Sequence, residues 1–252
     1  MTESNNKQAK GTRGGIWSFR LAATGLVFIA VGLVGARGGV SPLVAMLLIT
    51  LGSLIIIIGG LFGAVSLLRS RGTAGETPAL LAWIALLLGI GAVMNAANMM
   101  GSGGAPIHDI STDTADPPDF VAVAKLRGPE DNPAEYAGPE SASIQAEAYP
   151  DIETLEFLMP ADEVFPVALA AAENMGWEIV ASEATQGRIE ATATTPFVGF
   201  KDDVVIRLRE VESGTLVDIR SKSRFGKGDM GVNAERVRRY REELLGLANQ
   251  RT

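Results

Sequence analysis

Residues 203–223 read DVVIRLREVESGTLVDIRSKS, and this stretch decides the fold of the C-terminal half of the chain. Apolar and polar residues alternate on both sides of Ser213-Gly214, a dipeptide suited to a two-residue turn. The apolar residues that share one face are Val204, Ile206, Leu208, Val217 and Ile219. The stretch therefore predicts a hairpin of two strands, Asp203–Val211 and Thr215–Ser223.

Further elements are expected on both sides of this hairpin. Two strands, Trp177–Ala181 and Arg188–Thr194, are predicted before it, joined by a turn at 185–187. One helix is expected from a cap at Asp162 to Gly176, and a last helix from about Met230 to Asn249. The predicted fold class is α+β, with a four-stranded antiparallel sheet and two helices packed on it.

The N-terminal third is far more apolar than the rest of the chain. A helix needs about 20 apolar residues to cross a bilayer. Three stretches satisfy this requirement: Ile16 to Ala36, Pro42 to Leu68, and Pro78 to Met100. We therefore expect a tail over residues 1–15 and a three-helix transmembrane anchor over 16–101. No Asp, Glu, Lys or His interrupts the three stretches, which disfavours a pump or a secondary transporter.

The basic residues around these stretches predict their orientation. They gather before or at the start of the first stretch and between the second and third: Lys7, Lys10, Arg13, Arg20, Arg69 and Arg71. Because Lys and Arg are retained in the cytoplasm, the tail is expected there and the C-terminal domain outside it. This makes a multi-pass protein of the cell inner (plasma) membrane with a periplasmic or other extracytoplasmic domain. Cleavage of the first stretch as a signal peptide stays open.

Between the anchor and the domain lies a segment without clear periodicity. Residues 102–150 are rich in Pro, Gly, Asp and Glu and predict an irregular but ordered arm, followed by the α+β domain over 151–252. The formal charge is −7, with most acidic residues after His108, which argues against nucleic-acid binding. The chain has no cysteine, so disulfides and cysteine-bound metals are excluded. No cofactor is expected.

Several runs resemble one known family, the domain-of-unknown-function 1499 family (DUF1499). They are Ile107–Asp113 (IHDISTD), Pro117–Phe120 (PPDF), Asp202–Arg207 (DDVVIR), Asp218–Arg224 (DIRSKSR) and Gly228–Ala234 (GDMGVNA). The resemblance covers most of Ile107 to Tyr240. It implies a bacterial or plastid-type envelope setting, with membrane helices before the domain in some members, and it implies no activity.

The hairpin predicts an unusual charge pairing. If Glu212 pairs with Thr215, then Arg207 lies directly opposite Arg220, and like charges across a ladder are destabilising. An anion is therefore expected nearby. Two sources stay open. One is a carboxylate of the chain itself, from Glu190, Asp109 or Asp113, and the other is a bound anionic ligand, which guanidinium groups suit.

A glycine-rich loop follows the hairpin. Residues 226–231 (GKGDMG) match GxGxxG, but no βαβ unit surrounds them, so a dinucleotide site is excluded. The loop is either a plain turn with a helix cap at Asp229 or Asn233, or an anion site assisted by Arg224 and Arg236. The candidate ligand contacts are Arg207, Arg220, Arg224, Gly228, Asn233 and Arg236.

His108 is the only histidine of the chain. With Asp109 or Asp113 and a nearby serine it is a weak catalytic candidate for a hydrolase. The same three residues are too few for a divalent metal, so no metal site is predicted. The simpler interpretation is a histidine that orders the arm by hydrogen bonds.

Three hypotheses follow for a membrane-anchored extracytoplasmic module. It binds a partner, an anionic small molecule or a lipid headgroup; or it is a hydrolase that uses His108; or it is a purely structural envelope scaffold. A non-enzymatic role is favoured. The partners expected are membrane lipids, with other envelope proteins or an anionic ligand as further candidates.

Overall fold

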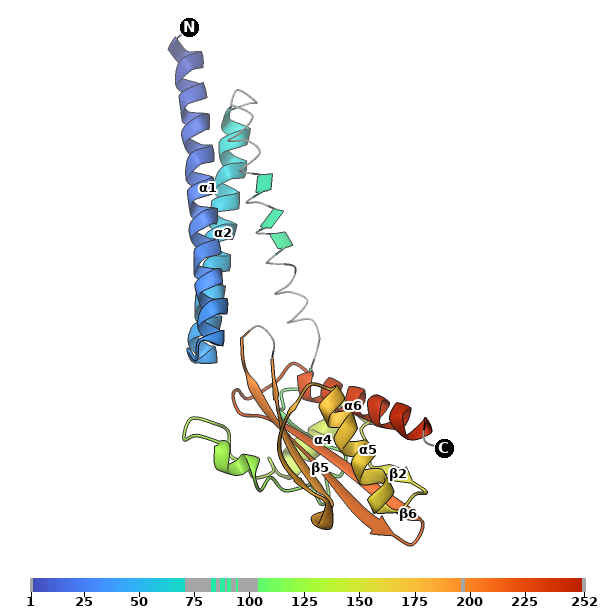
Figure 1. Ribbon diagram of the computed structural model, residues 1–252. Helices are drawn as coiled ribbons and strands as arrows, with labels where there is room; N and C mark the ends of the chain where they lie inside the picture. The colour runs from blue at the N-terminus through green and yellow to red at the C-terminus, as the bar shows by residue number, and fades with distance from the viewer. Residues whose placement is uncertain are drawn as a thin grey trace. The chain divides into compact units, whose positions relative to one another are not determined.

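Figure 1 shows the computed structural model of the protein. The structure describes residues 2–70, 83–84, 87–88, 90–91, 94, 104–195 and 198–250. The chain divides into two compact units, one containing Met1–Gly101 and the other formed by Ser102–Thr195 and Phe200–Thr252.

The first unit contains two long helices, α1 (Thr2–Arg37) and α2 (Pro42–Ser70). Within them, Ile16–Arg37 and Pro42–Val65 are long and apolar enough to cross a membrane. These agree with the first two expected spans. The third expected span, Pro78 to Met100, falls mostly outside the described residues, so the described part of the chain contains two membrane-capable helices in place of three.

Small residues let α1 and α2 approach closely. A Cβ atom added to Gly25 would lie 2.5 Å from the carbonyl oxygen of Gly52, and one added to Gly52 would lie as close to that of Gly25. About two helical turns before Gly25, the buried Ser18 hydroxyl donates to the carbonyl oxygen of Gly59 at 2.7 Å. Close backbone approach and a buried polar contact are the usual means by which apolar helices associate in lipid.

The second unit is built on an antiparallel sheet of six strands (Figure 1). They are β1 (Asp109–Ser111), β2 (Leu155–Phe157), β3 (Glu178–Glu183), β4 (Arg188–Thr194), β5 (Lys201–Val211) and β6 (Gly214–Ser223). The order is β1-β6-β5-β4-β3, with β2 beside β1 on the same edge of β6. The α+β class and the four predicted strands are confirmed, but the count of four is wrong because two three-residue strands complete the sheet.

Three α-helices accompany the sheet: α4 (Pro139–Ala148), α5 (Ala161–Asn174) and α6 (Val232–Asn249). Two short 3-10 turns are η1 (Val123–Leu126) and η2 (Ala184–Gln186). The last two α-helices confirm the predicted pair, although α5 starts after Pro160 instead of being capped by Asp162. α4 corrects the expectation that residues 102–150 are irregular throughout; its buried Gln145 side chain pairs with both backbone groups of Ser111.

One face of the sheet is apolar and is covered by α5 and α6 (Figure 1). The fully buried residues between the sheet and these two helices include Val164, Ala168, Ile206, Ile219, Val237 and Leu244. Trp177 stacks on Tyr240 at a centroid distance of 5.2 Å, and the Tyr240 hydroxyl donates to the Ala168 carbonyl at 2.9 Å. This apolar layer is the main core of the domain.

The hairpin β5–β6 has a different register from the predicted one. Val211 pairs with Gly214, so Glu212 and Ser213 form the turn and every partner is shifted by two residues. A two-residue shift keeps each side chain on its face, but it places Arg207 opposite Asp218 and Val205 opposite Arg220. The predicted like-charge pair is therefore wrong.

The position of Gly214 gives the physical reason for this register. Gly214 has φ +137, and a Cβ atom there would overlap the carbonyl oxygen of Phe157 in β2. Strand β2 therefore approaches so closely that only glycine fits at the first position of β6. A contact between distant segments fixes the turn, which local turn preferences cannot reveal.

Candidate functional site

The second face of the sheet carries charged side chains, and residues 112–137 cover it. We call it the charged face and define it by Asp109, Arg188, Glu190, Asp203, Arg207, Arg209, Asp218, Arg220, Lys222 and Arg224. They alternate with the apolar residues of the same strands, as the period of two requires. A small apolar cluster of Phe120, Val123 and Val205 lies between the sheet and the covering segment.

Arg220 is the most deeply buried cation of the charged face. Its side chain and that of Asp109 are both fully buried, and Nε and Nη2 donate to the two carboxylate oxygens at 2.9 and 3.0 Å. Nη1 also donates to the carbonyl oxygen of Pro118 at 3.0 Å, and Nη2 donates to that of Ala134 at 2.9 Å. Arg220 therefore ties strand β1 and two points of the covering segment to β6.

Aromatic rings and a lysine complete the surroundings of Arg220. Its guanidinium lies 4.6 Å from the Phe120 ring centroid and 5.3 Å from that of Tyr136. Lys222 Nζ lies 3.1 Å from the Asp109 carboxylate, and burial lowers the pKa of Lys222, opposed by the Asp109 charge. Burial raises the pKa of Tyr136 to about 12, assisted by Asp109. With its polar contacts made internally, Arg220 is a structural cation.

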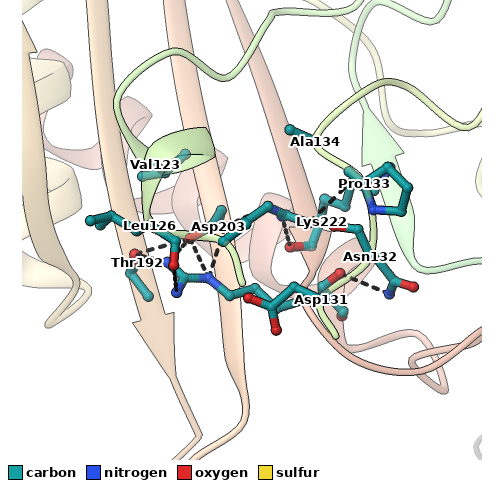
Figure 2. A network of polar contacts seen from close by, with 12 residues as sticks. Val123, Leu126, Asp131, Asn132, Pro133, Ala134, Thr192, Asp203 and Lys222 are labelled. Atoms are coloured by element: carbon teal, nitrogen blue, oxygen red, sulfur yellow. Dashed lines mark hydrogen bonds and ion pairs between the residues drawn. The ribbon is translucent and has the colours of Figure 1, made fainter. Parts of the chain in front are cut away.

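Asp203 is the centre of a second network, shown in Figure 2 beside Thr192. Arg224 donates to both of its oxygens, at 2.7 Å from Nη2 and 3.0 Å from Nε, and Thr192 donates at 3.0 Å. Arg127, from the covering segment, approaches the same carboxylate at 2.9 Å. Burial acts to lower the pKa of Arg224, but the bonds and charge of Asp203 outweigh it and raise that pKa. One carboxylate thus holds two guanidinium groups.

Glu190 in β4 anchors the covering segment at a third point. Its carboxylate accepts the backbone N–H groups of Val121, Ala122 and Val123 at 3.0, 2.8 and 2.9 Å. These are the donors at the start of η1, which a helical segment leaves unpaired. Arg188 lies 3.0 Å from the same carboxylate. Glu190 therefore caps η1 from a neighbouring strand and is not the partner of Arg207 or Arg220.

Arg207 and Arg209 form the more exposed end of the charged face. Both pair with Asp218, at 2.9 and 2.8 Å, and with Asp113, at 3.3 and 3.1 Å. Arg207 also pairs with Asp116 at 2.9 Å. The sequence left open whether a carboxylate of the chain or a bound ligand lies near Arg207 and Arg220. The structure brings a carboxylate of the chain to each of them, Asp113 to Arg207 and Asp109 to Arg220.

The glycine-rich loop before α6 is a turn closed by Asp229. The Asp229 carboxylate accepts the backbone N–H groups of Gly231 at 2.8 Å and Asn233 at 2.7 Å. Asn233 is buried and accepts from the Ser221 hydroxyl at 2.6 Å, while Arg236 pairs with Asp202 at 2.5 Å. Gly228 is exposed. Three of the candidate ligand contacts thus lie on this loop or helix, and a carboxylate of the chain already occupies the helix start.

His108 is kept apart from the carboxylates proposed to act with it. Its Nδ1 lies 3.2 Å from the carbonyl oxygen of Lys227. The Asp109 carboxylate pairs with Arg220, and the Asp113 carboxylate pairs with Arg207 and Arg209. In the described ranges, no group of three or more His, Asp and Glu side chains could hold a metal ion.

Sequence reasoning missed several residues of this site, chiefly Arg127, Arg188, Asp203 and Lys222. A signal was present for both residues that lie on the hairpin. Lys222 is two residues from Arg220, and Asp203 is four residues from Arg207, so each shares a strand face with an arginine already singled out. Arg127 carried no such signal. It lies in the covering segment and meets Asp203 only through the tertiary fold.

The family model described as "Protein of unknown function (DUF1499)" matches residues 109–244, more than half of the chain. The match begins at Asp109 and ends at Leu244, and so covers all six strands and most of α6. No curated protein matches the chain.

Proposed function

The chain belongs to the DUF1499 family, and from that premise we propose that it is a membrane-anchored docking module of the cell envelope. In this proposal the solvent-exposed surface of the domain binds at the membrane. The residues of the charged face hold the fold together and carry out no chemistry. The observation that carries this proposal is the complete internal pairing of Arg220 with Asp109 and of Arg224 with Asp203.

The membrane setting rests on α1 and α2, whose apolar segments have the length to span a bilayer. The positive charges before the first span and after the second favour a cytoplasmic N-terminus. With a third span over Pro78 to Met100, the domain lies on the extracytoplasmic side. The proposed location is therefore the inner (plasma) membrane, with the domain facing the periplasm or its equivalent.

The ion pairs favour docking over an anion site at the buried arginines and over a hydrolase. An anionic ligand at Arg220 or Arg224 would have to displace a fully buried carboxylate and lift the covering segment. A hydrolase would need His108 near Asp109 or Asp113, and these carboxylates are engaged by arginines. Breaking a buried pair costs about 3–5 kcal/mol, so these residues serve the fold better than they serve a ligand.

Native mass spectrometry of the full chain, released from mild detergent, tests this proposal. The variant carries Arg207→Ala and Arg209→Ala, which removes the exposed end of the charged face; the matched control is Arg239→Ala on the surface of α6. We expect the same adducts on all three proteins, and these adducts are lipids only. A discrete small anionic adduct that is lost in the double variant alone would overturn the proposal in favour of an anion site.

A further inference from the structure

Three segments meet at the end of the domain where the chain arrives from the anchor. Gly104 packs so tightly that a Cβ atom there would overlap the backbone of Met230 and Gly231. Phe200, the residue before β5, stacks on Phe225 with a centroid distance of 5.8 Å. The backbone N–H of Arg224 donates to the carbonyl oxygen of Lys201 at 3.0 Å. These contacts join 104–106, 200–201 and 225–232 into one surface.

This surface exposes large apolar side chains. The exposed fractions are 46% for Phe225, 47% for Met230 and 43% for Val232. Met230 is held in the left-handed region with φ 54, the one non-glycine residue with positive φ in the described part of the chain. Such a conformation is sterically unfavourable for a residue with a Cβ atom and persists only where the surroundings impose it. The fold therefore fixes an apolar side chain in solvent at this position.

The same surface is basic on an acidic domain. Residues 102–252 contain 27 acidic and 15 basic side chains, a formal charge of −12. Lys201 and Lys227 are both exposed here, and neither ammonium group makes an ion pair with any residue that the structure describes. We call Phe200, Lys201, Phe225, Lys227, Met230 and Val232 the tether surface. Exposed apolar side chains flanked by lysines are typical of surfaces that lie on anionic lipid.

The connection between this surface and the third apolar stretch is short. Only residues 101–103 separate Gly104 from Met100, where the third apolar stretch ends. Four Cα-to-Cα steps span at most about 15 Å. If the stretch spans the membrane, every orientation of the domain leaves the tether surface within reach of the headgroups. The acidic remainder of the domain is repelled by anionic lipid, which favours this end over the others.

We propose that the tether surface docks on the lipid bilayer. Phe225, Met230 and Val232 lie at the boundary of headgroups and acyl chains, and the two lysines contact lipid phosphates. This inference rests on the proposed docking function and names the partner as an anionic lipid surface. It also gives the domain a fixed orientation at the membrane.

The absence of cysteine makes a direct test possible in the full chain. Met230→Cys is labelled with a bimane fluorophore and reconstituted into vesicles of phosphatidylcholine and phosphatidylglycerol that contain lipids with a nitroxide on the acyl chain. The matched control is Leu158→Cys, because Leu158 is 91% exposed. Leu158 lies beside Gly214 at the start of β6, and the ten residues of β6 separate it from Phe225, about 30 Å away along the strand.

We expect the nitroxide lipids to quench the label at 230 several-fold more strongly than the label at 158. Equal quenching at both positions would overturn the inference. So would a label at 230 that is shielded from aqueous iodide but not quenched by the lipids, because a protein would then cover the surface. These outcomes are independent of the mass spectrum that tests the docking function, so the two proposals fail separately.

The lysines are tested with Lys201→Glu and Lys227→Glu in the Met230→Cys background. We expect quenching at 230 to fall at least two-fold in vesicles with phosphatidylglycerol and to change little in vesicles of phosphatidylcholine alone. An equal fall in both vesicles would overturn the role of lipid charge. The melting temperature of each labelled variant, matched to that of the unlabelled chain, excludes unfolding as the cause.

Discussion

The two faces of the sheet are formed by alternate residues of the same strands, but they are covered by different kinds of structure. On the apolar face, Ile206 and Ile219 are buried under α5 and α6, in contacts that have no required direction. On the charged face, Asp203 and Arg220 are buried under a segment with little regular structure, in contacts with fixed partners. The apolar face supplies stability, and the charged face specifies where the covering segment lies.

The difference between the two faces has an energetic reason. A buried ion pair gives little net stability compared with apolar residues of the same size, but losing one partner leaves an unpaired charge and costs several kcal/mol. An apolar contact is less sensitive to substitution, because a smaller apolar residue loses only part of the buried area. The covering segment contains four prolines and forms no helix or strand of its own over most of its length, so directed contacts hold it in place.

The largest effect is expected for Arg220→Ala, which leaves Asp109 buried without its main partner. We expect the free energy of unfolding of the full chain to fall by about 3–5 kcal/mol, measured by urea denaturation followed by circular dichroism. Ile206→Val, on the apolar face, is expected to cost only about 0.5–1.5 kcal/mol. Equal losses at the two sites would remove the distinction between the faces.

A smaller and more local effect is expected for Glu190→Gln. The amide replaces a carboxylate that accepts three backbone N–H groups at the start of η1, and we expect a loss of about 1–3 kcal/mol. Hydrogen exchange should speed up at residues 121–123 more than in β6. Uniform acceleration in both regions would mean that the covering segment and the sheet unfold as one unit.

The sequence predicted the apolar face better than the charged one. Alternation with period two identified β3 to β6 and assigned Ile206 and Ile219 to the core, because that signal is local. β1 and β2 have only three residues each, too few for a pattern, and they exist by pairing with β6. α4 begins with Pro139 at its first turn, which is a recognisable start signal, but its helix lacks an apolar stripe.

For the charged face, the residue types were predictable and the partners were not. Asp109 and Asp113 were among the carboxylates expected near the arginines; Asp109 pairs with Arg220, and Asp113 pairs with Arg207 and Arg209. The register error arose at Gly214, where the approach of β2 moves the turn by one residue. Pairing across distant segments depends on such contacts, and one sequence alone does not record them.

The smallest effect at neutral pH is expected for Tyr136→Phe, under the covering segment. The Tyr136 hydroxyl accepts and donates no hydrogen bond within the described part of the chain, so we expect the free energy of unfolding at pH 7 to change by less than about 0.5 kcal/mol. A larger loss of stability at pH 7 would show that the Tyr136 hydroxyl has a hydrogen-bond partner under the covering segment.

The pH dependence of Tyr136→Phe carries the sharper information. Burial raises the pKa of Tyr136 to about 12 in the folded state, against about 10 in the unfolded chain. The folded state therefore favours the neutral phenol, and this contribution is full below pH 10 and lost as the pH rises toward 12. The variant lacks the group, so its stability should fall less steeply than that of the parent between pH 10 and pH 12. Buried Tyr240 titrates in both proteins and cancels in the difference. Parallel curves would mean that the covering segment opens before Tyr136 ionises, and that the charged face, unlike the apolar one, separates from its cover while the sheet stays folded.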